Sequence, residues 1–317
     1  MIINSQKKLD FFKNYFIKKN YICIDTEFER KKTYFSKLSI ISISDGVKFF
    51  IFDILKFPTY IKFLKKILKS KKKIKILHGG TQDIEIFLKY KINIEPYFDT
   101  QIAAGFLGLD RNISYSNLVK IYLKKNIDKS HQNKDWLKRP LTKSQINYLK
   151  KDVLFLKEIH SKQLTLLKKT KKLKFIKEEL KSQLNKIKKN DGINSKFKKK
   201  LPLQIYKSPD FIKFIKIRDK KSKLKNLPKN WILKDEEIIT IIKNKKFKIL
   251  KKNNHFSNKE MDNLIKLLKK IFKIKLKKTN NEIYIKTLEF FRYLISKKYS
   301  IDPGLIASKY DLIDYKS

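Results

Sequence analysis

The stretch YICIDTEF, residues Tyr21–Phe28, decides how the rest of the chain is interpreted. Its apolar β-type residues predict a strand, and residues two apart on a strand lie on the same face. Asp25 and Glu27 therefore project together from the end of this strand. Two adjacent carboxylates repel each other unless a divalent cation lies between them. A metal site is one interpretation, and an ordinary solvated strand end is the other.

A second acidic motif is HGGTQD, residues His78–Asp83, which follows a short predicted strand at Lys73–Leu77. Two glycines and a helix that starts near Thr81, with Thr81 as N-cap, place Asp83 in the first helical turn. Its carboxylate could support a metal, but acidic residues also occur there because they complement the helix dipole. His78 is open to the same choice, as a ligand or as a hydrogen-bonded structural histidine.

The third motif is the pair Tyr148 and Asp152 in a helix predicted at Thr142–Lys169, where Thr142 and Gln145 have the spacing of a capping box. Positions i and i+4 of a helix lie one above the other, so phenol and carboxylate face one point. The alternative is a Tyr packed on the core and a solvated Asp.

Taken in order, D-x-E, Asp and Y-x-x-x-D supply four carboxylates and one phenol. A two-metal phosphodiesterase needs such a set. Hard oxygen ligands and the absence of Cys ligands favour Mg²⁺ or Mn²⁺ over zinc.

The remaining pattern predicts an α/β fold for the first half of the chain and helices for the second. Leu38–Ser44 and Val47–Ile54 are β-type runs separated by Asp45-Gly46, a strong hairpin signal. Further helices are predicted at these ranges: Thr59–Leu68, Thr100–Leu107, Ser114–Leu123, Lys171–Lys189, short segments within Leu203–Leu250, and Glu282–Ser308.

Composition favours a nucleic-acid partner, because the formal net charge is +48. Only five of the 78 basic residues are Arg, and the spread of lysines also fits an AT-rich genome that writes Lys at solvated positions. Cys23 is the single cysteine, which fits a reducing cytosol. Met1–Tyr21 has no long apolar run, so no signal peptide is expected, and no stretch of the sequence approaches the ~20 apolar residues of a membrane span.

At this point the sequence resembles the ribonuclease D family, in the tyrosine subclass of the DEDD exonuclease superfamily. The resemblance is carried by IDTEFER at Ile24–Arg30, HGGTQDIEIF at His78–Phe87, FDTQIAAGFLG at Phe98–Gly108, and DKSHQNKDWLKRPLTKSQINYLKKDVLFL at Asp128–Leu156. It implies an α/β, ribonuclease H-like exonuclease domain with a mixed sheet at residues 1–170 and a helical linker at 171–200. An all-α HRDC-like domain at 201–275 and a truncated second helical domain at 276–317 would follow.

The resemblance also implies roles for single residues. Asp25, Glu27, Asp83 and Asp152 would be catalytic ligands of two Mg²⁺ or Mn²⁺ ions, and Tyr148 would orient the attacking water. Contacts with the substrate are implied for Thr26, Phe28, His78, Gln82, Lys129 and Arg139. Lys129 and Arg139 could instead be ordinary solvated cations.

The function implied is that of a 3′→5′ exoribonuclease that releases nucleoside 5′-monophosphates, with tRNA precursors as expected substrates. A monomer in the cytoplasm is expected. The alternatives are a DNA exonuclease of the same superfamily and a non-catalytic RNA-binding protein. A basic protein of the membrane surface is a fourth possibility, against which the acidic set argues.

Overall fold

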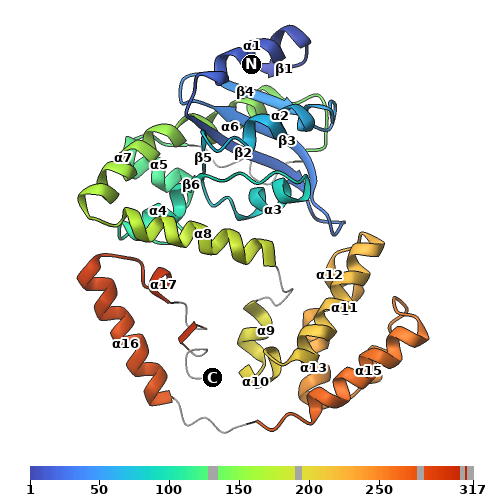
Figure 1. Cartoon of the computed structure of the whole chain (residues 1–317). Coiled ribbons are helices and arrows are strands. Elements are labelled where there is room, and N and C mark those ends of the chain that lie inside the picture. Colours follow the sequence, from blue (N-terminus) through green and yellow to red (C-terminus); the bar gives the residue numbers. More distant parts are fainter. Residues whose placement is uncertain (128–134, 190–194, 277–281, 308–310, 313–317) are drawn as a thin grey trace. The chain divides into compact units, whose positions relative to one another are not determined.

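The computed structural model describes residues 1–127, 135–189, 195–276, 282–307 and 311–312, and it divides into two compact units (Figure 1). Unit 1 comprises Met1–Glu29, Leu38–Lys188 and Phe290–Ser308. Unit 2 comprises Arg30–Lys37, Lys189–Glu289 and Lys309–Ser317. Within the described part of the chain, no helix is both long and apolar enough to span a membrane.

Unit 1 is built on a six-stranded mixed sheet with the strand order β1-β4-β3-β2-β5-β6. The strands are β1 (Ile2–Ile3), β2 (Tyr21–Glu29), β3 (Lys37–Ser44), β4 (Phe49–Asp53), β5 (Ile74–Leu77) and β6 (Tyr97–Asp99). β3 and β4 pair antiparallel around the turn at Asp45-Gly46, so the predicted hairpin is confirmed. The pairs β1–β4, β2–β5 and β5–β6 are parallel.

The helices of unit 1 are α1 (Gln6–Ile17), α2 (Tyr60–Leu68), α3 (Thr81–Lys89), α4 (Thr100–Phe106), α5 (Tyr115–Leu123), α6 (Lys143–Leu154), α7 (Leu156–Lys169) and α8 (Leu173–Lys189). Two predictions about them were wrong in detail. The N-cap of α3 is Gly80, without a side-chain hydrogen bond, rather than Thr81. The predicted helix Thr142–Lys169 is two helices that meet at Phe155.

The two faces of the sheet bury different helices, and β2 shows how its sequence achieves this. Ile22 and Ile24 point to the core that also contains residues of α1, α2, α3 and α8. Cys23, one residue out of step, points to the opposite face and packs with Val153 of α6. Because side chains alternate along a strand, Asp25 and Glu27 follow Cys23 onto the face that α6 covers.

The last segment of unit 1 returns from the far end of the chain. Helix α16 (Glu282–Tyr299) leads to α17 (Pro303–Ile306), where one continuous helix was predicted. The Asp302 N–H donates to the Gly105 carbonyl at 2.8 Å, and its carboxylate accepts from the Arg111 N–H at 3.1 Å. Leu305 covers Gly105 so closely that a Cβ there would lie 2.5 Å from it. Lys172 donates to the Ser300 carbonyl at 2.9 Å, which adds a polar anchor.

Unit 2 is helical, and its helices surround a separate apolar core. They are α9 (Ser195–Lys200), α10 (Leu203–Tyr206), α11 (Pro209–Lys225), α12 (Lys229–Ile232), α13 (Asp235–Asn244), α14 (Lys248–Lys251) and α15 (Asn258–Phe272). A buried ion pair joins Arg218 of α11 to Asp235 of α13 at 2.6 Å. The HRDC-like character of this region and the domain boundaries drawn from the sequence stay predictions.

Candidate active site

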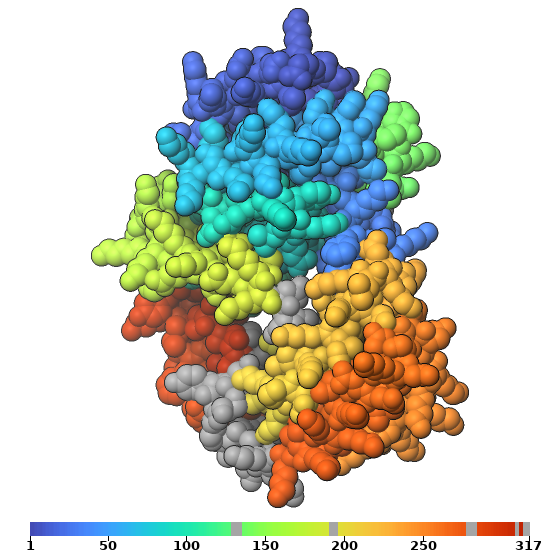
Figure 2. Space-filling model, turned by 45° about the vertical axis from the view of Figure 1, so that its right-hand side comes forward, coloured from blue at the N-terminus to red at the C-terminus, as the bar shows by residue number. Residues whose placement is uncertain are grey.

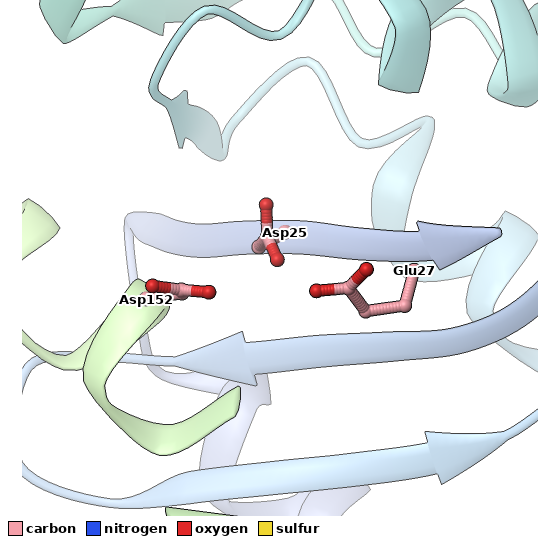
Figure 3. A group of neighbouring side chains, drawn as sticks. All are labelled: Asp25, Glu27 and Asp152. Carbon is pink, nitrogen blue, oxygen red and sulfur yellow. The ribbon is translucent and has the colours of Figure 1, made fainter. Parts of the chain in front are cut away.

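Three carboxylates converge where β2 meets α6. Asp25 and Glu27 come from β2 and Asp152 comes from α6, and the three side chains point toward one another (Figure 3). One oxygen from each carboxylate lies within 4.8 Å of the other two. The strand motif and the helix motif, in which Asp25 and Asp152 are 127 residues apart, therefore supply one cluster of hard oxygen ligands.

Helix α6 is positioned by its cap and by its apolar face. The Thr142 hydroxyl accepts from the Gln145 N–H at 3.2 Å, and the Gln145 amide oxygen accepts from the Thr142 N–H at 2.9 Å, so the predicted capping box is confirmed. Leu149 and Val153 are buried against the sheet on the two sides of Asp152. This packing fixes the carboxylate over β2.

Tyr148 lies one helical turn before Asp152, and its hydroxyl donates a hydrogen bond to the Asp152 carboxylate. Its ring packs near the Trp136 ring, with 5.8 Å between the centroids. Burial raises the pKa of the Tyr148 phenol far above its ordinary value, and the charges of the neighbouring carboxylates raise it further. The phenol therefore keeps its proton and acts as a hydrogen-bond donor.

The carboxylates of the cluster are held in unfavourable surroundings. Burial raises the pKa of Asp25 well above its ordinary value, and repulsion from Asp152, Glu27 and Asp83 adds to the effect. Burial and repulsion from Asp152 and Asp83 raise the pKa of Glu27 to about 9, and burial raises that of Asp152 to about 7. A site that is so costly to ionise is typical of one completed by cations.

The metal-free protein should consequently lose stability as the pH rises. A carboxyl whose pKa is raised on folding holds its proton better in the folded state, so it favours folding at low pH. That contribution is lost between the ordinary value near 4 and the raised values of about 7 for Asp152 and 9 for Glu27. We expect a lower Tm in EDTA at pH 8.5 than at pH 5.5, and recovery when Mg²⁺ is added at pH 8.5.

Glu27→Gln protein is the control for this measurement, because it removes one titrating group of the cluster and keeps the side-chain shape. Its Tm should fall less between the two pH values than that of the unchanged protein. Equal falls in both proteins would show that the pH dependence comes from other carboxyls.

Asp83 stands beside the cluster rather than in it. It lies in the first turn of α3, as predicted, and Thr26 of β2 donates two hydrogen bonds to its Oδ1 atom. The Thr26 N–H lies 3.1 Å from that oxygen, and the Thr26 hydroxyl donates to the same atom. Burial raises the pKa of Asp83 to about 6, although the hydrogen bonds from Thr26 lower it. Thr26 thus orients the fourth carboxylate.

We expect Thr26→Val to weaken divalent metal binding by about tenfold, because partners of metal ligands typically contribute 10- to 100-fold to affinity. The change keeps the branched shape and the backbone N–H but removes the hydroxyl donor. Titration calorimetry with Mn²⁺ measures the effect directly, and Thr26→Ser should bind nearly as the unchanged protein does. Normal Mn²⁺ affinity in the Val variant would refute this role.

The turn before α3 is fixed by Asp99, whose carboxylate accepts from the backbone N–H groups of Gly79 at 3.0 Å and Gly80 at 2.8 Å. Asp99 also caps α4, where its carboxylate accepts from the N–H groups of Gln101 and Ile102. Gly79 has a φ of +60°, a conformation that disfavours residues with a side chain. Asp99 thereby helps to place Asp83.

The residues expected to contact substrate have varied surroundings. Both ring nitrogens of His78 are engaged, with the Thr100 hydroxyl at 3.0 Å and the Ile113 carbonyl at 3.1 Å. Gln82 is exposed on α3. Phe28 is half-buried and packs against the main core. Lys129 lies outside the described residues.

Arg139 has a structural role. Its guanidinium forms a two-point ion pair with Asp53, at 2.6 and 2.8 Å, and it donates to the Trp136 carbonyl at 2.8 Å. It also donates to the Ser39 hydroxyl at 2.9 Å. The contacts with RNA suggested by the resemblance stay predictions for all these residues.

Tyr115 was missed at the sequence level. It is the first residue of α5, and its buried hydroxyl donates to the carbonyl of Lys151 at 3.0 Å, next to Asp152. Burial raises its pKa well above the ordinary value, and the charge of Asp152 contributes. No spacing in the sequence connects Tyr115 with Lys151, because the contact depends on how α5 packs.

Comparison with known proteins identifies the family of unit 1. Residues 1–168 match the model of a family described as a 3′-5′ exonuclease. The chain belongs to this 3′-5′ exonuclease family. As a family member it is similar to ribonuclease D of Escherichia coli strain K12, with 37% identity over 142 residues. It is also 35% identical over 159 residues to ribonuclease D of Shewanella sp. strain ANA-3.

These matches cover only part of each chain. They span 44% of this chain and 38% of the E. coli protein, and 50% of this chain and 41% of the Shewanella protein. The chain thus matches about two fifths of the length of these relatives.

Structural likeness extends further. The crystal structure of E. coli RNase D, described as an exoribonuclease involved in structured RNA processing, matches with a TM-score of 0.78 and 23% identity over 98% of this chain and 88% of that chain. The catalytic core of RRP6 from Trypanosoma brucei matches with a TM-score of 0.57 and 18% identity over 85% and 79%. The predicted ribonuclease H-like fold with a helical C-terminal region is confirmed.

Proposed function

We propose that this chain is a metal-dependent 3′→5′ exoribonuclease that removes nucleoside 5′-monophosphates from RNA 3′ ends, with tRNA precursors among its substrates. The observation that carries the proposal is the convergence of Asp25, Glu27 and Asp152 within 4.8 Å beside the Tyr148 hydroxyl. Membership of the 3′-5′ exonuclease family and similarity to ribonuclease D support it.

The donor set fits hard divalent cations. Asp25, Glu27 and Asp152 would hold Mg²⁺ or Mn²⁺, and Asp83 would complete the binding of a second ion. When bound, such ions lower the pKa of water and stabilise the charge that develops at the phosphate and the leaving 3′ oxygen. The protein has to fix the orientation of the carboxylates. The hydrogen bonds from Thr26 to Asp83 and from Tyr148 to Asp152 do so.

Tyr148 would position the attacking water by accepting a hydrogen bond from it, while the Tyr148 O–H donates to Asp152. Because its raised pKa keeps the phenol protonated near neutral pH, Tyr148 would not act as a general base. Positioning is worth a large rate factor on its own, because a correctly held nucleophile avoids much of the entropy cost of meeting the phosphate.

Similarity to ribonuclease D favours RNA over DNA as the substrate, whereas the carboxylate cluster would suit either nucleic acid. The net charge of +48 supports binding of a polyanion. A monomeric, cytoplasmic enzyme remains our expectation.

The test is digestion of a 5′-labelled RNA hairpin with a single-stranded 3′ tail, beside a DNA of the same sequence, with Mg²⁺, Mn²⁺ or EDTA. The proposal predicts a metal-dependent ladder that shortens from the RNA 3′ end, together with free nucleoside 5′-monophosphates. Faster shortening of the DNA would establish the DNA exonuclease instead. RNA binding without shortening in any metal would leave a non-catalytic binding protein.

A further inference from the structure

The segment that follows the metal-binding strand belongs to the helical unit. Strand β2 ends at Glu29, and residues Arg30–Lys37 are part of unit 2. This segment, RKKTYFSK, contains four cations and no acidic residue. Its four cationic residues are exposed. An eight-residue segment with this charge, joined directly to the strand of Asp25 and Glu27, is therefore presented by the helices of unit 2.

Hydrogen bonds to α11 hold the segment in one conformation. The Tyr34 hydroxyl donates to Asp219 at 2.8 Å, and the Tyr34 N–H donates to the Asn226 carbonyl at 3.3 Å. The Phe35 N–H donates to the Asn226 side chain at 3.2 Å. Asn226 is the left-handed C-cap of α11, so the segment is anchored at a helix end. In Figure 2 the mid-blue atoms of the segment lie against gold atoms of the α11–α12 region.

Two lysines extend the charge of the segment onto the helices. The Lys223 and Lys229 nitrogens lie 5.6 and 5.7 Å from the centroid of the Tyr34 ring. The same nitrogens lie 2.6 and 2.8 Å from the Asp219 oxygens. The Asp219 carboxylate thus forms ion pairs with both ammonium groups and fixes their positions, and these three side chains together keep a net positive charge.

Apolar side chains are exposed close to these cations in the sequence, with Phe35 inside the segment and Trp231 two residues after Lys229. Trp231 of α12 is 54% exposed and Phe35 is 37% exposed. Leu224, in the last turn of α11, is 71% exposed. Exposed rings interleaved with ordered cations suit single-stranded nucleic acid, whose bases stack on aromatic faces while its phosphates meet the charges.

We propose that this basic and aromatic surface, made of Arg30–Lys37, Lys223, Lys229 and Trp231, binds the single-stranded 3′ region of the RNA substrate. The inference rests on the proposed function, because it names the part of the RNA that the enzyme holds. Bases stack on Trp231 and Phe35, and the cations contact phosphates without reading the sequence. An acidic protein would match the charge, but it would leave the exposed rings without flat partners.

The test measures binding without hydrolysis, in EDTA, by fluorescence anisotropy with three probes. These are a hairpin RNA with a single-stranded 3′ tail, the same hairpin with a blunt end, and poly-glutamate. Trp231→Ala should weaken binding of the tailed RNA by about tenfold, since stacking of one base is worth roughly that much or more. Trp231→Phe, which keeps a ring, should restore most of the affinity.

A charge variant tests the second part of the surface. The double variant Lys31→Gln and Lys32→Gln should reduce the slope of log affinity against log salt by about 1 to 2, as expected when one or two phosphate contacts are lost. Lys269→Gln, an exposed lysine of α15, and Phe175→Ala, an exposed ring of α8, are the matched controls and should bind normally.

Three results would overturn the proposal. The first is unchanged binding of the tailed RNA by both surface variants, and the second is an equal loss with the blunt hairpin. The third is poly-glutamate binding with the same dependence on Trp231. The proposed function can fail independently, because these measurements need no hydrolysis.

Discussion

Asp25→Asn protein is expected to release nucleoside 5′-monophosphates at least about 10³-fold more slowly than the unchanged protein at saturating RNA and Mg²⁺. Bound metal contributes several kcal/mol to such reactions, and each 1.4 kcal/mol is a factor of ten. Asp25 is the central carboxylate, because Asp152, Glu27 and Asp83 all contribute to its raised pKa. The single-turnover rate on a tailed RNA measures the effect.

Two measurements separate lost chemistry from lost folding. Asp262→Asn changes an exposed carboxylate of α15 and should leave the rate unaltered. The Tm of Asp25→Asn in EDTA at pH 8.5 should be equal to or higher than that of the unchanged protein, because a buried charge has been removed. A variant that folds and keeps a tenth of the rate would contradict the assignment of Asp25 as a ligand.

Tyr148→Phe should lower kcat by about 10²-fold and leave KM for RNA nearly unchanged, within the range found for groups that handle the reacting proton or water. The ring can stay beside Trp136, so the change removes only the hydrogen bond to Asp152. Steady-state kinetics on a tailed RNA give the two constants separately. Tyr299→Phe, at an exposed position of α16, is the control.

Titration calorimetry of Tyr148→Phe protein with Mn²⁺ distinguishes between the possible roles of the Tyr148 hydroxyl. Normal Mn²⁺ affinity with a lowered kcat would place the hydroxyl at the attacking water. Mn²⁺ affinity lowered in proportion to kcat would mean that it only orients Asp152. An unchanged kcat would show that the hydroxyl has no part in the reaction.

The sequence predicted the parts of the site that follow from local periodicity. Alternation along β2 places Asp25 and Glu27 on one face, and the i, i+4 spacing on α6 brings Tyr148 to Asp152. Both relations depend only on the geometry of a single element. The meeting of strand and helix within 4.8 Å needed the family resemblance as well, because no local pattern states which face of the sheet α6 covers.

The parts that were not predicted depend on partners distant in the chain. The ion pair between Arg139 and Asp53 could not be predicted, because the two residues are 86 positions apart. The role of Thr26 as a donor to Asp83 depends on a contact across 57 residues. The break at Phe155 left no glycine or proline as a signal, because the turn between α6 and α7 is set by packing.

The return of Phe290–Ser308 to unit 1 sets an order of events during synthesis. A ribosome that has finished Lys188 must still make Lys189–Glu289, which takes roughly 5 to 20 seconds at usual rates, before the segment that covers Gly105 emerges. The helices of unit 2 can fold in that interval, during which the surface around Gly105 is still exposed because Leu305 has not yet been made. Chaperones that recognise exposed apolar chain would have their longest opportunity at this stage.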